Sequence, residues 1–227
     1  MGKRGPKPKH LINLKWRSEL AYVVGLIASD GCLSKDGLLI DLTSKDREQL
    51  YNYSKCLGIN FKIGSKWNSV GNRILRIQFK NRIFYDFLLS VGLTPKKSLT
   101  IGKLAIPDKY FFDFLRGSFD GDGTFYSYWD PRWRSSHMFY IEFISASKKH
   151  ILWIQDEIKK RLNIIGHITN DGIGLTCQLK YAKKDSLEII KKMYYSKKVI
   201  CLTRKLVKIQ KALKTEEKQQ KIYARVL

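Results

Sequence analysis

The sequence predicts an α+β protein made of two similar halves, and three observations lead to this prediction. The segment Gly25–Gly31 recurs in type as Gly117–Gly123, with glycines matching at both ends and an Asp-Gly pair closing each copy. Each segment ends an apolar stretch of helical length, and stretches of strand-like alternation and of helical periodicity follow it in the same order. This shared order, αββαββα, predicts two pseudo-symmetric halves.

In the first half, residues 20–28 are apolar almost all round, which predicts a buried helix. Ser18 is expected to cap this helix, and Gly31 to end it in a left-handed conformation. Strands are expected over 38–42, 61–66 and 74–80, a helix capped by Ser44 over 45–56, and a last helix over 82–91.

In the second half, the corresponding buried helix is expected over 111–121. Strands are expected over 124–129, 138–144, 164–169 and 175–180. A helix capped by Ser147, a helix over 185–194 and a helix from 204 complete the pattern. The predicted organisation is therefore a basic flexible arm (1–17), an N-terminal half (18–100), a C-terminal half (101–212) and a C-terminal tail (213–227).

The charge of the chain predicts a polyanionic partner. Lys and Arg number 43 against 20 Asp and Glu, so the formal net charge is +23 and the sequence pI is about 9.9. Nucleic acid is the partner that such charge favours. No apolar run has the length of a membrane span and no signal-type segment opens the chain, so no membrane partner is expected. An intracellular protein is expected, in the cytoplasm of a prokaryote or in an organelle matrix. Its cysteines lack paired spacing, which argues against a zinc site or a disulfide framework.

Both buried helices end in an aspartate directly before a glycine, at Asp30 and Asp122. A helix C-terminus disfavours negative charge, so a cation is expected there. Small residues spaced four apart, Gly25 with Ser29 and Gly117 with Gly121, would let the helices pack backbone to backbone and bring the two carboxylates together. A lone Asp-Gly pair is most often a turn, but its recurrence after the same kind of helix favours a divalent-metal site that faces phosphates.

These segments resemble the two copies of the LAGLIDADG motif, and the chain from about 18 to 210 resembles a single-chain LAGLIDADG homing endonuclease. The resemblance implies motif helices at the interface of two αββαββα halves, and antiparallel sheets that form a saddle over double-stranded DNA. It also implies that Asp30 and Asp122 bind catalytic Mg²⁺, assisted by the backbone carbonyls of Ser29 and Gly121. Ca²⁺ is expected to support binding without cleavage. The sequence departs from the motif where Ala28 stands opposite Asp120, and where Arg116 replaces an apolar residue.

The same family typically has a basic residue near the scissile phosphate. In the first half the family-like segment Gly92–Ser98 makes Lys97 the catalytic candidate. In the second half the comparable segment Cys201–Lys205 makes Lys205 the candidate, with Lys198 in reserve. The alternative for each is an ordinary solvated surface lysine.

Strand alternation predicts which side chains face DNA. Leu75, Ile77 and Phe79 are expected in the core of one strand, and Leu175, Cys177 and Leu179 in the core of another. The insertion around 126–137 adds aromatic and basic residues, although local packing is an equal alternative for its tryptophans. The expected DNA contacts are Lys35, Lys62, Lys66, Arg73, Arg76, Gln78, Lys80, Tyr126, Tyr128, Arg132, Arg134, Thr176, Gln178 and Lys180.

The resemblance implies a site-specific DNA endonuclease that makes a metal-dependent, staggered double-strand break with 3′ overhangs. Because both motif helices lie in one chain, we expect a monomer on an asymmetric homing site, encoded by a mobile intron. An RNA maturase of LAGLIDADG type or a non-cleaving DNA-binding protein remains the alternative. A PD…ExK nuclease is disfavoured because Glu157 lies in a helical run, whereas that motif needs a strand.

Overall fold

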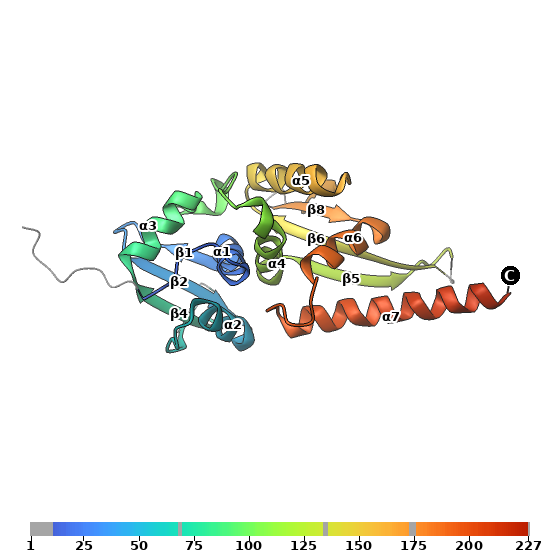
Figure 1. Ribbon diagram of the computed structural model, residues 1–227, viewed down its shortest axis with the longest axis horizontal. Helices are drawn as coiled ribbons and strands as arrows, with labels where there is room; N and C mark the ends of the chain where they lie inside the picture. The colour runs from blue at the N-terminus through green and yellow to red at the C-terminus, as the bar shows by residue number, and fades with distance from the viewer. Residues whose placement is uncertain (1–10, 68–69, 134–135, 173–175, 227) are drawn as a thin grey trace, which may run out of the picture.

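Two four-stranded antiparallel sheets and seven α-helices make up the part of the chain that the structure describes (Figure 1). The structure is a computed structural model, and it describes residues 11–67, 70–133, 136–172 and 176–226, without the side chains after Lys218. The predicted α+β class with two pseudo-symmetric halves is confirmed, because both sheets have the same strand order. Within the described residues, no helix is both long enough and apolar enough to cross a membrane.

The first half begins with its buried helix and forms its sheet in the order β1-β2-β4-β3. Its elements are α1 (Ser18–Asp30), β1 (Gly31–Leu33), β2 (Leu39–Ser44), α2 (Arg47–Leu57), β3 (Gly64–Trp67), β4 (Arg73–Lys80) and α3 (Arg82–Val91).

The second half repeats this arrangement with the sheet order β5-β6-β8-β7. Two short 3₁₀ turns, Lys97–Leu99 and Asp108–Tyr110, lie in the connection between the halves. The elements that follow are α4 (Phe111–Gly121), β5 (Thr124–Trp129), β6 (His137–Ser145), α5 (Lys148–Leu162), β7 (His167–Asn170), β8 (Cys177–Tyr181), α6 (Lys183–Met193) and α7 (Thr203–Val226).

The start and end of α1 differ from the prediction. Ser18 is the first helical residue, and Arg17 takes the capping position without a side-chain hydrogen bond. The left-handed conformation predicted for Gly31 is wrong, because Gly31 is extended (φ −86°, ψ 154°) and opens strand β1. Its lack of a side chain still matters, since a Cβ there would lie 2.7 Å from the Ile27 Cα. The three-residue strand β1 itself was not predicted, because it is too short for alternation to stand out.

Other boundaries also differ. Helix α2 begins two residues later than predicted, with Asp46 rather than Ser44 at its capping position. Ser44 instead accepts a hydrogen bond from the Asp46 N–H at 3.0 Å. Helix α7 continues without a break to Val226, so the described part of the segment expected as a C-terminal tail, from residue 213 on, is helical. Ile209 and Ala212 anchor this helix in the core, and good helix formers follow them.

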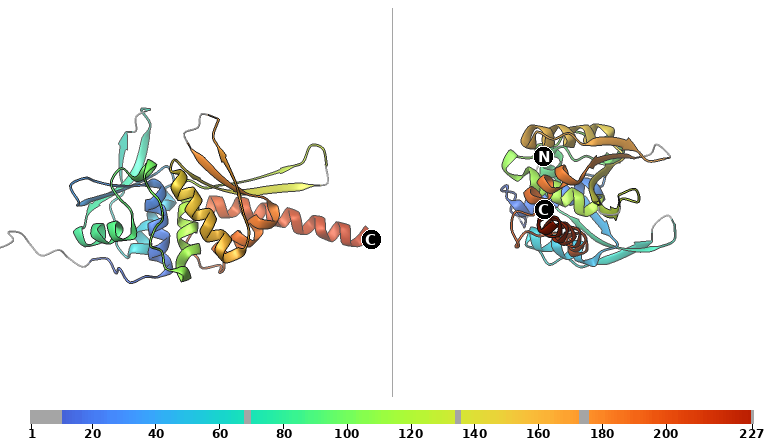
Figure 2. Two further views of the ribbon diagram at one scale, coloured as in Figure 1. Left: turned by 90° about the horizontal axis from the view of Figure 1, so that it is seen from above. Right: turned by 90° about the vertical axis from the view of Figure 1, so that its right-hand side faces the viewer.

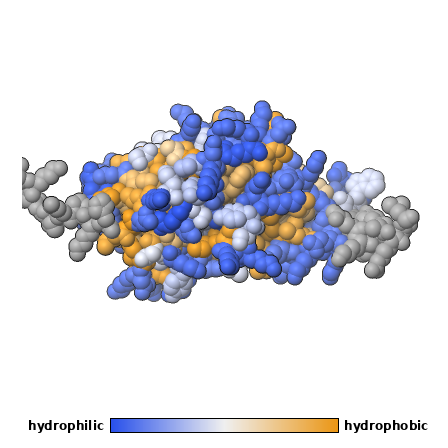
Figure 3. All heavy atoms as spheres, in the orientation of Figure 1, coloured by the Kyte–Doolittle hydropathy of each residue, from blue (hydrophilic) through white to orange (hydrophobic). Residues whose placement is uncertain are grey.

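Helices α1 and α4 stand side by side between the two sheets, and the hairpins β3–β4, β5–β6 and β7–β8 project from one side of the molecule (Figure 2). Helices cover the other face of each sheet, so the faces between the hairpins stay open. Hydrophilic side chains cover much of the face drawn in Figure 3. The arrangement is a saddle, with the helix pair at its centre.

Candidate active site

The contact between α1 and α4 is made by glycine backbones. A Cβ built on Gly25 would lie 2.2 Å from the Phe114 carbonyl oxygen, and one built on Gly117 would lie 2.1 Å from the Tyr22 carbonyl oxygen. A Cβ on Gly121 would lie 1.9 Å from the Ser29 hydroxyl oxygen. No side chain fits at these three positions, so the helices cross as closely as two backbones can. Gly25, Ser29, Gly117 and Gly121 therefore all lie at this crossing.

This crossing brings Asp30 and Asp122 together. Helix α1 ends at Asp30, and Asp122 directly follows α4, so both carboxylates emerge at the same end of the helix pair. Asp30 Oδ2 lies 3.1 Å from the position of a Cβ on Gly121. Burial, followed by the negative charge of Asp122, raises the pKa of Asp30 to about 6. Asp122 is more exposed, and loss of hydration also raises its pKa. Two neighbouring carboxyl groups whose pKa values are raised in this way favour the binding of a cation beside them.

Gln49 is a site residue that the sequence did not reveal. It is buried on α2, its amide nitrogen donates to Asp30 Oδ2 at 2.8 Å, and its amide oxygen accepts from the Ser44 hydroxyl at 2.9 Å. The one available signal was a polar residue next to Leu50 on the apolar side of an amphipathic helix. Gln49 fixes the orientation of the Asp30 carboxylate.

Lys97 and Lys205 hold equivalent positions at the ends of the two motif helices. Lys97 Nζ donates to the carbonyl oxygens of Gly31 at 2.7 Å and Ser29 at 3.5 Å. Lys205 Nζ donates to those of Gly123 at 2.6 Å and Gly121 at 3.1 Å. Both lysines are buried, so neither is a solvated surface lysine. They neutralise the negative ends of the two helix dipoles.

The burial of these lysines makes their charge more costly. Loss of hydration lowers the pKa of Lys97, and it lowers the pKa of Lys205 to about 8, against the raising effect of nearby aspartates. The reserve candidate Lys198 lies elsewhere, in a hollow that it shares with Ser18 and Arg116 at the opposite end of the helix pair. It does not join the carboxylates.

The oxygen atoms at this end of the helix pair suit a hard divalent cation. They are the carboxylates of Asp30 and Asp122 and the carbonyls of Ser29 and Gly121. A cavity of about 210 Å³ lies beside them, lined by Ser29, Lys97, Asp122 and Thr176 among others. Among the described residues, no group of three or more His, Cys, Asp or Glu side chains could hold a metal ion. A metal here would therefore depend on backbone carbonyls and water as well as on the two acids.

Asp120, which stands where the first motif has Ala28, ties the halves together. It is fully buried, and its Oδ2 accepts hydrogen bonds from the Tyr22 hydroxyl at 2.7 Å and from the Leu202 N–H at 2.7 Å. Burial raises its pKa to about 6. Asp120 thus joins α1, α4 and the segment before α7.

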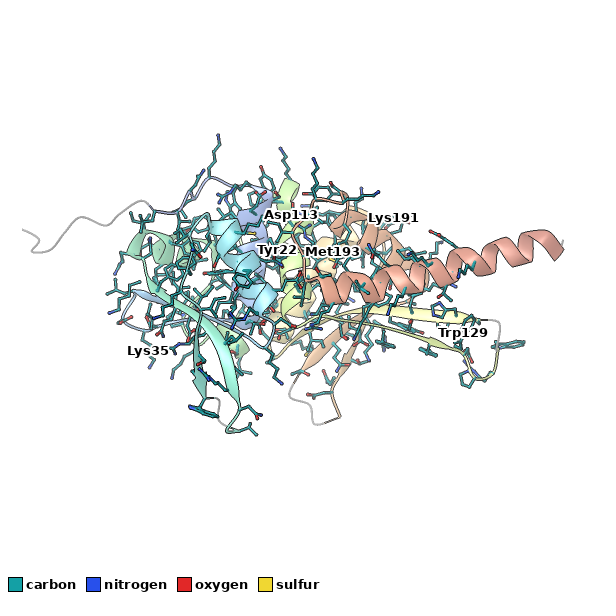
Figure 4. The ribbon with its side chains drawn as sticks, turned by 90° about the horizontal axis from the view of Figure 1, so that it is seen from below. Tyr22, Lys35, Asp113, Trp129, Lys191 and Met193 are labelled. Atoms are coloured by element: carbon teal, nitrogen blue, oxygen red, sulfur yellow. The ribbon has the colours of Figure 1, made fainter. Side chains whose placement is uncertain are left out.

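Arg116, the other departure from the motif, is a buried structural cation. It donates to the carbonyl oxygens of Met193 at 2.6 Å and Ile200 at 2.9 Å, and to Asp113 at 2.7 Å. Figure 4 shows Asp113, Tyr22 and Met193 near the helix pair, away from the β5–β6 hairpin on which Trp129 lies. The arginine fastens the segment after α6 to α4.

The predicted DNA-contacting residues fall into two groups, according to how exposed their side chains are. Strand β4 alternates as predicted around the buried Ile77. Arg134 lies outside the described residues. The exposed candidates are Lys35, Lys62, Arg73, Gln78, Lys80, Tyr126, Tyr128 and Arg132, and the half-buried ones are Lys66, Arg76, Thr176, Gln178 and Lys180.

Several of the basic candidates are paired with acids. Lys66 Nζ lies 3.1 Å from Asp41 Oδ2, and Lys180 Nζ lies 3.0 Å from Glu142 Oε1. Arg132 is likewise held by the Asp130 carboxylate at the tip of the β5–β6 hairpin. Part of the positive charge on these faces is therefore already paired with acidic side chains of the protein itself, which the sequence alone did not indicate.

Three tyrosine rings stack on the open face of the second sheet. The centroids of Tyr126 and Tyr140 are 5.3 Å apart, and Tyr128 lies 6.4 Å and 6.3 Å from them. Tyr140 was not predicted. At the nearby hairpin tip Trp133 is 69% exposed, so local packing does not bury it, whereas the Trp129 ring lies 5.0 Å from that of His137.

Two halves that meet through glycine-packed helices, with paired carboxylates at the end of those helices, define the single-chain LAGLIDADG fold. No family model and no curated protein matches the sequence. Solved structures do match. The homing endonuclease I-WcaI bound to its DNA recognition sequence has a TM-score of 0.60 and 13% identity, over 86% of this chain and 88% of that one.

Two further solved structures share the fold. The meganuclease I-SmaMI bound to uncleaveable DNA has a TM-score of 0.60 and 15% identity, over 91% of this chain and 92% of that one. Full-length DUF199/WhiA from Thermatoga maritima has a TM-score of 0.56 and 16% identity, over 95% of this chain and 69% of that one. The chain therefore has the single-chain LAGLIDADG fold, as its resemblance predicted.

Proposed function

We propose that the protein is a site-specific DNA endonuclease that makes a metal-dependent, staggered double-strand break with 3′ overhangs. The observation that carries this proposal is the meeting of Asp30 and Asp122 at the centre of a saddle with basic side chains on both open faces. The DNA-bound neighbours of the same fold support a DNA partner. We further propose that a mobile intron encodes the protein.

Mg²⁺ is the proposed cofactor, held by Asp30 and Asp122 with the carbonyl oxygens of Ser29 and Gly121. When bound, such an ion activates water and stabilises charge on the leaving oxygen. The chain's own contribution is to hold these ligands in place. Gln49 orients the Asp30 carboxylate, while Lys97 and Lys205 fix the helix-end carbonyls and add positive charge beside a bound phosphate.

The two halves suit a monomer acting on an asymmetric target. Strands β5 and β6 of the second half have six and nine residues, while β1, the strand of the first half equivalent to β5, has three. Gln49 also supports only Asp30, so the two halves of the site are not identical. A non-palindromic site is the target that unequal halves would bind.

The test uses duplex DNA selected from a random library by binding in Ca²⁺, followed by incubation in Mg²⁺. Asp30→Asn and Asp122→Asn remove a charge and keep the side-chain shape, so binding in Ca²⁺ should persist while double-strand cleavage in Mg²⁺ is lost. Asp36→Asn is the matched control, since Asp36 is exposed in the β1–β2 turn, and it should cleave normally.

The outcome also separates the rival functions. Selected DNA that the unmodified protein binds but never cuts would contradict the endonuclease and favour a non-cleaving DNA-binding protein. Preferential binding of structured intron RNA over every selected duplex would favour a maturase. Full cleavage by both Asn variants would exclude Asp30 and Asp122 as the metal-binding acids.

A further inference from the structure

Each open sheet face carries one buried carboxylate at the same place. Asp41 in β2 lies between the buried residues Ile40 and Leu42, so its side chain is on the opposite, open face. Glu142 in β6 lies between two buried residues in the same way. In register, Asp41 is opposite Gln78 of β4 and Glu142 is opposite Lys180 of β8. The two acids are thus equivalent positions of the two halves.

Both acids hold cations that would otherwise face a ligand. Asp41 is 8% exposed, and its Oδ2 lies 3.1 Å from Lys66 Nζ and 3.7 Å from an Arg76 guanidinium nitrogen. Its other oxygen has no hydrogen-bond partner among the described residues, so these two cations are what offsets its charge. Glu142 is 5% exposed and its Oε1 lies 3.0 Å from Lys180 Nζ.

A carboxylate on a surface that binds phosphates acts against affinity. The carboxylate repels the phosphate backbone directly. It also offsets part of the positive charge of neighbouring Lys and Arg side chains, so less of that charge is available to neutralise phosphates. The same acid also restrains long side chains that would otherwise sample many rotamers. This restraint matters most for Arg76. Its guanidinium group also donates a hydrogen bond to the Gln78 side chain, and the planar shape of that group suits a base edge in the major groove.

We propose that Asp41 and Glu142 are specificity-determining residues, which weaken binding to non-cognate DNA and hold Lys66, Arg76 and Lys180 for contacts with base edges. This inference rests on the proposed DNA partner and does not depend on cleavage. Discrimination between DNA sequences then comes from a lowered affinity for non-cognate DNA as well as from favourable contacts with the cognate bases.

The experiment measures binding of a duplex of random sequence in EDTA at stepped salt concentrations, by fluorescence anisotropy. Asp41→Asn and Glu142→Gln should each raise affinity about fivefold or more at low salt and steepen the slope of log affinity against log salt by about 1. On a duplex selected by the unmodified protein, the ratio of specific to non-specific affinity should fall about tenfold. Thermal melting establishes that each variant is folded.

Matched controls carry the same charge change behind the sheets. Asp86→Asn frees Arg82 on α3, and Glu188→Gln frees Lys191 on α6, and both are exposed ion pairs. These controls should leave the salt slope unchanged. Variants at Asp41 and Glu142 that behave like the controls, or that lose affinity for all duplexes equally, would overturn the inference while leaving DNA binding intact. Failure of the unmodified protein to bind any duplex would overturn the proposed function as well.

Discussion

Glu48 of the first half caps the last helix of the second half. Its carboxylate accepts the Thr203 N–H at 3.2 and 3.1 Å and also the Thr203 hydroxyl, where α7 begins. Beside it, Arg204 pairs with Asp46 at 2.8 Å, and the Asn52 side chain donates to the Cys201 carbonyl at 2.9 Å. The halves are therefore joined at α2 and α7 as well as at the motif helices.

This cap predicts the effect of Glu48→Ala. Loss of the carboxylate leaves the first N–H of α7 without its partner, and we expect unfolding free energy to fall by about 1 kcal/mol. Urea denaturation measures the change. Asp86→Ala, which breaks an exposed ion pair within α3, should cost under about 0.5 kcal/mol. An equal, small effect of both variants would contradict a capping role for Glu48.

The glycine crossing predicts a larger effect of Gly117→Ala. The new Cβ would lie 2.1 Å from the Tyr22 carbonyl oxygen, so the motif helices must separate. We expect destabilisation of about 3 kcal/mol or failure to fold, measured by thermal and urea unfolding. Gly102→Ala is the control, because nothing lies within 4 Å of a Cβ there and the stability should hardly change. A stable Gly117→Ala protein would show that the helices do not touch here.

Buried His150 predicts a stability change with pH. Burial lowers its pKa to about 4, and a ring nitrogen lies 2.8 Å from the Gly102 carbonyl oxygen. Because the folded state binds this proton more weakly than the unfolded state does, the contribution of His150 to stability falls as pH drops from about 6.5 to about 4, by up to about 3 kcal/mol. The raised pKa values of Asp30 and Asp120 act in the opposite direction over this range, so the loss is measured as the difference between urea-unfolding pH profiles of the unmodified protein and of His150→Asn. Parallel pH profiles of the two proteins would contradict the assignment.

The Arg116 contacts predict that Arg116→Met is strongly destabilising. The change leaves two carbonyl oxygens without a donor and leaves buried Asp113 without its cation, so we expect a loss of about 3–5 kcal/mol. Adding Asp113→Asn should recover part of this loss, because the uncompensated charge is gone. Denaturant unfolding of the single and double variants tests both statements. No recovery in the double variant would mean that the carbonyl contacts dominate.

The sequence by itself determined the halves, the motif helices and the acids at their ends. Helix periodicity, strand alternation and small-residue spacing are local properties, so α3, α4 and β5 have the predicted bounds. The core-facing residues of strand β4 followed in the same way, because alternation assigns one face to the interior. Lys97 and Lys205 were found through the resemblance to a known family, from the segments that follow the last predicted helix of each half.

Only the tertiary structure decided how distant residues meet. Gln49 reaches Asp30, Asp41 pairs with Lys66, and Glu48 caps a helix 155 residues away, and no local pattern encodes such contacts. Gly31 is extended because β1 pairs with β2 at that point, which overrides the local preference for a left-handed helix end. The sequence fixes the periodicities of its elements, whereas the packing of those elements decides which polar groups become partners.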